Sequence, residues 1–212
     1  MIKIYTICLS EIQEMEEYLF LCADSERKEK AIRFRRADDR LRCLSAGYLM
    51  KHYVPGFSEK LLRIGAQGKP YLPEGIPFNV SHGGDYIVLA VCGEVRSIGV
   101  DVEPVREMEY YRDILPYSMT ENEQLFAGDD ENRAARLWTR KESLYKCFGE
   151  GIGDISEMPE VVQDQVSFSG DLFRLKSWKT DDHMFSVAWP EDHPAREQSI
   201  KRTAVQIPPQ AG

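Results

Sequence analysis

The feature that most constrains the fold is a doubled order of strand, helix and hairpin patterns along the chain. Before about residue 105, an alternating run from Ile2 to Cys8 precedes helical stretches and then short β-rich runs separated by glycines. After residue 105, helical stretches precede a second set of β-rich runs that ends at Trp189. Identity between the halves is too faint to prove a repeat. The order predicts an α+β fold of two similar lobes, 1–105 and 106–190, each a small antiparallel sheet with helices.

Capping residues and periodicity locate individual helices. The stretch from Asp38 to Pro55 carries apolar residues at helical spacing. Thr120 followed by Glu123 is a capping-box start for a short helix. The run from Asp130 to Phe148 has an apolar stripe, and Gly149 is a suitable stop. We therefore expect three helices at these places.

The middle and the end of the chain have different patterns. Phe78 to His82, Tyr86 to Cys92 and Ser97 to Val102 are short β-rich runs with glycines between them, which favours an antiparallel meander. Beyond Pro190, prolines stand among polar residues. This composition predicts a flexible tail over 191–212.

Charge and composition exclude several classes of protein. A net charge of −8 argues against non-specific nucleic-acid binding, which needs clustered Lys and Arg to neutralise phosphates. The basic cluster from Arg27 to Arg36 suits either a small phosphorylated ligand or a solvated helix face. Met1 to Leu9 is too short an apolar run for a secretory signal, and no stretch approaches the ~20 apolar residues that span a bilayer. The five cysteines have no zinc-site spacing. We expect a cytoplasmic protein that binds neither nucleic acid nor membrane.

A pair of carboxylates ends one β-rich run. Asp101 and Glu103 stand two residues apart, so their side chains point to the same side of a strand. Magnesium is typically held by one or two carboxylates together with substrate phosphates. Taken alone, such a pair is more often solvated charge; if it binds magnesium, it implies a phosphorylated ligand.

Two further groups have similarly ordinary explanations when taken singly. Glu142 and Lys146, four residues apart, share one helix face and form a common surface ion pair, although Trp138 places a large aromatic beside the carboxylate. Lys69 precedes a proline, and a strand later ends in Ser81-His82. Taken alone, Lys69 is explained as a lysine in a turn, and His82 as a histidine whose hydrogen bonds are satisfied in the core.

Together, the three groups resemble the 4'-phosphopantetheinyl transferase superfamily, in particular the broad-specificity type that activates surfactin synthetase. The resemblance runs from about Ile2 to Trp189, and Ser143 stands where the family usually has alanine. The matching motifs, in order, are Lys69-Pro70 with Phe78-Asn79-x-Ser81-His82, Gly99-x-Asp101-x-Glu103, and Trp138-x-x-Lys141-Glu142-x-x-x-Lys146.

The resemblance implies two pseudo-symmetric lobes with coenzyme A in the cleft between them, so that the active site lies at the lobe interface. It implies an enzyme that moves phosphopantetheine from coenzyme A to a serine of an acyl or peptidyl carrier protein, with magnesium, and releases 3',5'-ADP. We also expect the protein to be a monomer. The implied catalytic residues are Glu142, Lys146, His82 and Asp101. The implied magnesium ligands are Asp101, Glu103 and Glu142.

Coenzyme A contacts also follow from the resemblance. The residues implied are Lys69, Ser81, His82 and Lys146, with Arg27, Lys30 and Arg42 at the 3'-phosphate of the nucleotide. Arg27 stands where lysine is commoner, so Lys28 is an alternative. Glu121 aligns with an acidic residue near the family's metal site, and proton transfer and helix capping both remain open for it.

The implied reaction is displacement at the β-phosphorus of coenzyme A by the carrier serine. Glu142 is then the general base, directly or through a metal-bound water, and Lys146 is placed to protonate the leaving phosphate. Magnesium and the cations His82 (if protonated), Lys141 or Lys146 would meet the developing negative charge. Two alternatives are a metal-dependent phosphodiesterase that hydrolyses coenzyme A and a non-catalytic coenzyme A binding adaptor.

The segment after the carboxylate pair is rich in aromatic and methionine residues. Such residues are enriched at protein interfaces, and the segment follows the expected metal site directly. It is either a docking surface for the carrier protein or packing at the lobe junction. Its members are Met108, Tyr110, Tyr111, Ile114, Leu115, Tyr117 and Met119.

Overall fold

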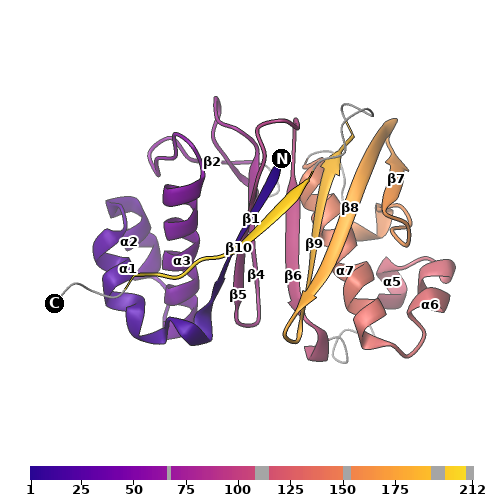
Figure 1. Cartoon of the computed structure of the whole chain (residues 1–212), viewed down its shortest axis with the longest axis horizontal. Helices are drawn as coiled ribbons and strands as arrows, with labels where there is room; N and C mark the ends of the chain where they lie inside the picture. The colour runs from indigo at the N-terminus through magenta and orange to yellow at the C-terminus, as the bar shows by residue number, and fades with distance from the viewer. Residues whose placement is uncertain (66–67, 108–114, 150–153, 192–198, 209–212) are drawn as a thin grey trace.

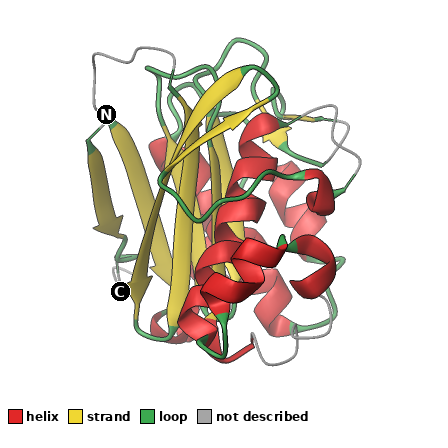
Figure 2. Cartoon of the chain, turned by 90° about the vertical axis from the view of Figure 1, so that its right-hand side faces the viewer, coloured by secondary structure: helices red, strands yellow, loops and turns green. Residues whose placement is uncertain are grey.

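The computed structural model describes residues 1–65, 68–107, 115–149, 154–191 and 199–208. It contains two four-stranded sheets that pack face to face, with helices over the outer face of each sheet (Figure 1). In the view turned by 90°, the helices lie mainly along one side of the strands (Figure 2). Among the residues described, no helix combines the length and apolar character needed to cross a membrane.

The first sheet has the order β10-β1-β5-β4, in which β10 is parallel to β1 and the other neighbours are antiparallel. A separate two-stranded hairpin of β2 and β3 lies between α3 and β4 in sequence. The elements are β1 (Ile2–Cys8), η1 (Leu9–Glu11), η2 (Gln13–Met15), α1 (Glu16–Cys22), α2 (Ser25–Ala31), α3 (Ala37–Tyr53), β2 (Arg63–Ile64), β3 (Pro70–Tyr71), β4 (Phe78–Gly83), β5 (Tyr86–Val91) and β10 (Ile200–Ala204).

The second sheet is fully antiparallel and has the order β6-β9-β8-β7. The long helix α7 packs against β6 and β9. The elements are β6 (Gly99–Pro104), η3 (Val105–Glu107), α5 (Leu115–Ser118), α6 (Glu121–Ala127), α7 (Glu131–Phe148), η4 (Ile155–Glu157), β7 (Gln165–Phe168), β8 (Asp171–Thr180) and β9 (His183–Pro190).

The central strands are buried on both faces. In β5, Ile87 and Leu89 join the core beneath α1 and α3, whereas Val88 joins the core between the two sheets. In β9, Val187 faces the first sheet and Ala188 belongs to the core beneath α7. Because side chains alternate across a strand, a strand covered on both faces is apolar throughout. This explains why all residues of β5 are buried.

The fold class is as predicted: α+β, with two small sheets covered by helices, although the first sheet is antiparallel only over β1, β5 and β4. The predicted helices are also confirmed as α3, α6 and α7. Thr120 and Glu123 form the predicted capping box, and Gly149 ends α7 with a positive φ of 85°. These features depend on residues close together in sequence, which makes them predictable.

Two predictions, one about the partner of a strand and one about a flexible tail, are wrong. The expected meander places 97–102 beside Tyr86–Val91, yet β6 pairs with β9 and so belongs to the second sheet. Residues 199–208 are not part of a flexible tail, because β10 pairs with β1 and Val205 is buried against the first lobe. The rest of that predicted tail, 192–198 and 209–212, lies outside the described residues.

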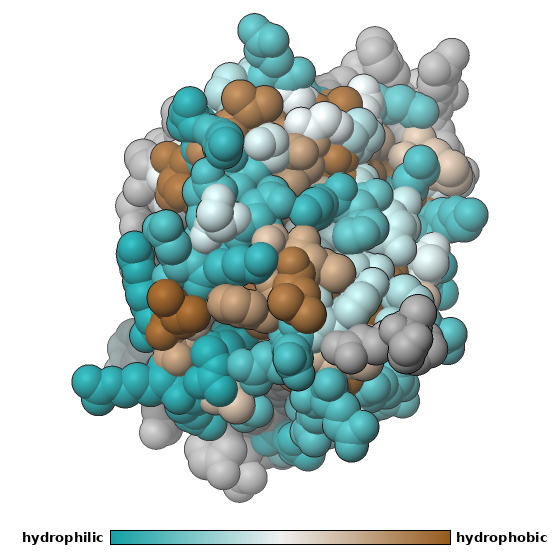
Figure 3. Space-filling model, turned by 90° about the vertical axis from the view of Figure 1, so that its left-hand side faces the viewer, coloured by the Kyte–Doolittle hydropathy of each residue, from teal (hydrophilic) through white to brown (hydrophobic). Residues whose placement is uncertain are grey.

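The outer face formed by the first lobe is mostly hydrophilic, with separate apolar areas between hydrophilic ones (Figure 3). Leu21, Ile32 and Phe34 are exposed apolar residues of α1 and of the connection between α2 and α3. The basic residues Arg33 and Arg35 in that connection are exposed as well. This arrangement fits a solvated face.

Candidate active site

Asp101 of β6 lies at the centre of a polar cluster between the two lobes. Its side chain is 2% exposed. Oδ1 accepts hydrogen bonds from Ser81 Oγ at 2.8 Å and from Lys146 Nζ at 2.6 Å. Oδ2 is buried and has no hydrogen-bond partner within the described part of the chain. Burying a carboxylate oxygen without a partner destabilises the folded state, so this atom is suited to binding a cation or accepting a hydrogen bond.

Lys146 joins Asp101 to Glu142 on α7. Its Nζ lies 3.5 Å from Glu142 Oε2 and donates to Ser81 Oγ at 3.0 Å. Burial alone would lower the pKa of Lys146, but the carboxylates of Asp101 and Glu142 outweigh it and raise that pKa. Lys146 is therefore a cation at neutral pH.

Glu142 has the electrostatic character of a base. Burial raises its pKa, and the charge of Asp101 adds to this, while Lys146 only partly opposes the shift. A carboxylate with a raised pKa is a better proton acceptor near neutral pH than a solvated one. The sequence placed this group on the same face as Lys146, and the structure does so too.

Two glycines allow the site's elements to approach closely. A Cβ on Gly83 of β4 would lie 2.0 Å from the carbonyl oxygen of Val102, and one on Gly99 would lie 2.0 Å from that of Ser143 in α7. No side chain fits at either distance. Gly83 thus brings β4 to β6, and Gly99 brings β6 to the backbone of α7.

Asn79 links the two sheets beside the cluster. Its buried Oδ1 accepts a hydrogen bond from the backbone N–H of Val100 at 2.8 Å. The strands β4 and β6 belong to different sheets, so this side chain supplies a link where ladder pairing is absent. Ser81, two residues along the same face, then meets Asp101. Sequence reasoning quoted Asn79 as part of a motif but gave it no role.

His82 and Arg42 lie at the edge of the site. Local desolvation lowers the pKa of His82, with the charges of Arg42 and Lys146 adding to the effect. Arg42 Nη2 donates to the carbonyl of Gly84 at 3.1 Å, and its Nη1 pairs with Asp39 at 3.0 Å. His82, Arg42 and Lys146 together offer N–H donors at this edge, which suits a phosphate.

The predicted magnesium ligands are only partly assembled. Asp101 and Glu142 flank Lys146, and Glu103 is partly buried two residues further along β6. Within the described ranges, no three His, Cys, Asp or Glu side chains lie close enough together to hold a metal. The observation that fits a metal is the unpartnered Oδ2 of Asp101.

Two predicted coenzyme A contacts have other partners. Arg27 is 5% exposed, and its Nε forms a 2.6 Å ion pair with Glu59 inside the first lobe. Binding a phosphate would compete with that buried pair, and the contact of Arg27 with coenzyme A stays a prediction. Lys28 donates to the carbonyl of Leu21 at 3.2 Å, and Lys30 is exposed on α2.

Lys69 donates from Nζ to the carbonyl oxygens of Ile98, at 2.9 Å, and Lys146, at 2.8 Å. Burial lowers its pKa. The predicted contact with coenzyme A therefore competes with two backbone acceptors.

Lys141 does not face the site. It is 1% exposed and lies 2.9 Å from Glu123, which is 0% exposed. Its Nζ also donates to the carbonyl of Met158. Of the two lysines proposed from the sequence to meet the charge, only Lys146 reaches Asp101. Glu121 is exposed at the start of α6, where Thr120 and Glu123 make the cap.

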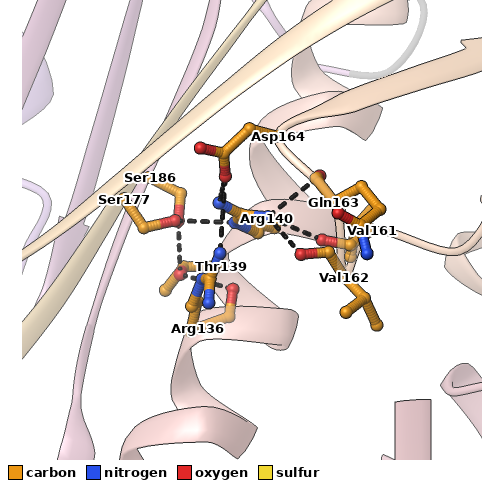
Figure 4. Close-up of polar contacts among 9 residues, drawn as sticks. All are labelled: Arg136, Thr139, Arg140, Val161, Val162, Gln163, Asp164, Ser177 and Ser186. Atoms are coloured by element: carbon orange, nitrogen blue, oxygen red, sulfur yellow. Dashed lines mark hydrogen bonds and ion pairs between the residues drawn. The ribbon is translucent and has the colours of Figure 1, made fainter. Parts of the chain in front are cut away.

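Arg140 anchors the segment that follows η4. Its side chain is 1% exposed and donates to three successive carbonyls, a hydroxyl and a carboxylate (Figure 4). The acceptors are Val161 O, Val162 O, Gln163 O, Ser177 Oγ and Asp164 Oδ1. Sequence reasoning missed this role because neither its partners nor their distance is visible in the sequence.

Two family models match the chain. One, described as the 4'-phosphopantetheinyl transferase superfamily, matches residues 97–194. The other, described as 4'-phosphopantetheinyl transferase, N-terminal, matches residues 12–94. Between them the two matches include every residue of the polar cluster around Asp101.

Curated relatives carry the same description. The chain is 33% identical over 112 residues to the 4'-phosphopantetheinyl transferase AcpT of Salmonella typhi, covering 50% of this chain and 58% of that protein. It is 30% identical over 147 residues to the 4'-phosphopantetheinyl transferase of Bacillus subtilis, covering 65% of each. A relative from Bacillus pumilus is 28% identical over 166 residues, 71% of this chain and 70% of its own. The chain thus spans about three fifths of the length of the first two.

Proposed function

We propose that this chain belongs to the 4'-phosphopantetheinyl transferase superfamily, whose two models match 97–194 and 12–94, and that it transfers phosphopantetheine from coenzyme A to a serine of an acyl or peptidyl carrier protein. The observation that carries the proposal is the cluster of Asp101, Lys146 and Glu142 between the lobes. These residues come from the two motifs that lie within the superfamily match.

Coenzyme A is proposed to bind between the lobes. Ser81, His82 and Lys146 would contact its pyrophosphate, since a hydroxyl, an imidazole and an ammonium can all donate to phosphate oxygens. Arg42 and Lys30 would meet the 3'-phosphate. Arg42 already reaches the turn next to His82, which supports this assignment.

Magnesium is proposed to bind at Asp101 Oδ2, with Glu103 and Glu142 as further ligands. The unpartnered oxygen supports this choice, and oxygen ligands suit a hard cation. When bound, the ion would neutralise negative charge on the phosphates. Lys146 then keeps its contact with Oδ1, so one carboxylate serves both cations.

The chain's own residues divide the proton transfers between them. Glu142 takes the proton from the carrier serine, whose oxygen forms a bond to the β-phosphorus. The bond from that phosphorus to the oxygen of 3',5'-ADP breaks, and Lys146 supplies a proton to the leaving phosphate. Burial raises the pKa of Glu142, which favours proton acceptance, whereas the carboxylates of Asp101 and Glu142 raise the pKa of Lys146, which keeps it charged to meet the negative charge on the phosphates.

A mass spectrum tests the proposal. An apo carrier protein incubated with the chain, coenzyme A and magnesium should gain the mass of one phosphopantetheine group. Incubation without a carrier separates the phosphodiesterase alternative, because hydrolysis would release 3',5'-ADP in both samples. An unchanged carrier with intact coenzyme A would contradict both reactions.

Three companion proposals concern the setting. The chain is proposed to act in the cytoplasm, as a monomer, with a carrier protein rather than nucleic acid as partner. The net charge of −8 supports the last point, since nucleic-acid binding favours basic surfaces.

A further inference from the structure

The side chain of Lys69 contacts the backbone next to β6 and the backbone of α7, the two elements that carry the site residues. Its Nζ donates to the carbonyl of Ile98, which precedes β6, and to the carbonyl of Lys146, in the last turn of α7. The strand carries Asp101, and the helix carries Glu142 and Lys146. One ammonium from the first lobe therefore contacts the backbone of both site-bearing elements.

The backbone around Lys69 is itself fixed. The N–H of Gly65 donates to the Lys69 carbonyl at 2.9 Å. Pro70 follows, and a proline restricts the residue before it to extended conformations. Pro70 also pairs with Ile64 in the hairpin of β2 and β3. The side chain thus starts from a defined position.

The two acceptors need such a donor. Carbonyls in the last turn of a helix have no partner inside the helix, and a cation there is favoured by the helix dipole. The carbonyl of Lys146 is one of these. Next to it, Gly99 lets β6 touch the backbone of Ser143 and Cys147. Lys69 fastens strand and helix at this contact, two residues before Asp101.

We propose that Lys69 is a positioning residue for the transfer reaction: its ammonium sets the Lys146–Asp101 contact through the backbone of β6 and α7 and is not a ligand of the coenzyme A phosphates. This inference rests on the proposed function. An ammonium has three N–H groups, and two of those of Lys69 point to carbonyls. A displacement of ~1 Å at a reacting group can cost on the order of a hundredfold in rate.

Lys69→Met tests the proposal, because methionine keeps most of the side-chain volume and removes the donors. The exposed Lys3→Met on β1 is the matched control. We expect Lys69→Met to lower kcat at saturating coenzyme A by about tenfold or more, while the Kd for coenzyme A from calorimetry changes less than about threefold. Lys3→Met should leave both unchanged.

A spectroscopic measurement reports the contact without turnover. The amide groups of Gly99 and Cys147 share peptide units with the carbonyls of Ile98 and Lys146. Their amide signals in a two-dimensional nitrogen–proton spectrum of the free protein should shift in Lys69→Met and stay in place in Lys3→Met. Unshifted signals would overturn the proposal.

Lys69→Arg retains a cation if Lys69→Met does not fold. Its guanidinium can donate to both carbonyls, so coenzyme A affinity should stay within about threefold of wild type, with kcat reduced less than in any folded Lys69→Met sample. An unchanged kcat in Lys69→Met, or a tenfold weaker Kd for coenzyme A in either variant, would overturn the inference. Failure of the wild-type chain to modify a carrier would instead overturn the proposed function.

Discussion

Lys141 and Glu142 are consecutive in α7, yet Lys141 forms a buried ion pair with Glu123, whereas Glu142 lies beside Lys146 at the polar cluster. Consecutive helical residues differ in direction by about 100°. We therefore expect Lys141 to contribute to stability and, under the proposed function, Glu142 to contribute to chemistry, and substitutions should separate the two effects.

Glu142→Gln should lower kcat by about a hundredfold or more, because the amide cannot accept the serine proton. The unfolding midpoint in urea should stay close to wild type, because the substitution removes only one ion pair, the 3.5 Å contact between Glu142 and Lys146. Steady-state kinetics at saturating coenzyme A and a urea titration measure both. A normal kcat would show that another group takes the proton.

Lys141→Met should destabilise the chain by about 3–5 kcal/mol, because it leaves the buried Glu123 carboxylate without its cation. Adding Glu123→Gln should recover part of that loss. Urea unfolding of the single and double variants gives the comparison. A double variant less stable than Lys141→Met would contradict the ion-pair explanation.

Asp101→Ala should reduce turnover by at least ~10²-fold, as expected for the loss of a major electrostatic group. The expected magnesium dependence should weaken in parallel, because Oδ2 is the proposed ligand. Rates measured across a magnesium titration test this. Near-normal turnover at low magnesium would show that the metal assignment is wrong.

His183 should make stability depend on pH. Burial lowers its pKa, and Arg106 adds to this, against the opposing charges of Asp85, Asp181 and Asp182. The unfolded chain takes up the proton first as pH falls below about 6.5, so stability should decrease from there downward.

Urea midpoints at pH 7.5 and 5.5 measure this effect, and His183→Gln should reduce the difference between them. His82, whose pKa is also lowered, contributes with the same sign and remains in the variant. The exposed His52→Gln serves as control. Equal pH dependence in wild type and His183→Gln would contradict the role given to His183.

Tyr117 should contribute to docking of the carrier protein. It is 83% exposed, whereas Leu115 and Met119 of the same predicted surface are buried. The other four residues of that prediction lie in 108–114, outside the described residues. Tyr117→Ser should lower kcat/KM for the carrier about tenfold and leave KM for coenzyme A unchanged.

The exposed Leu21→Ser on α1 controls for a general surface effect. Raising salt at constant magnesium should leave kcat/KM for an acidic carrier unchanged or slightly higher, because screening removes repulsion from a chain of charge −8. A steep decrease with salt would show that a basic patch, such as Arg33 to Arg36, attracts the carrier.

The sequence predicted what depends on local order. Helix α7 and the Thr120–Glu123 cap follow from residues within a few positions of one another. The order of motifs also indicated Asp101, Glu142 and Lys146 as one cluster, and the structure brings these three together.

Contacts between distant segments were not predictable in the same way. A strand pattern does not name its partner, so the pairing of β6 with β9 was missed. Arg27 and Lys69 each belong to motifs, but their side chains turn to Glu59 and to backbone carbonyls respectively. Such choices depend on tertiary distances, which residue types alone do not encode.

The position of β10 has a consequence for synthesis of the chain. Strand β1 comprises Ile2–Cys8, whereas its parallel neighbour β10 comprises Ile200–Ala204. During translation, the edge of β1 is exposed until nearly the whole second lobe has left the ribosome. Unpaired strand edges promote association between chains, so nascent molecules are vulnerable at this edge until 200–204 have been made. The sheet of the first lobe is completed only when β10 pairs with β1.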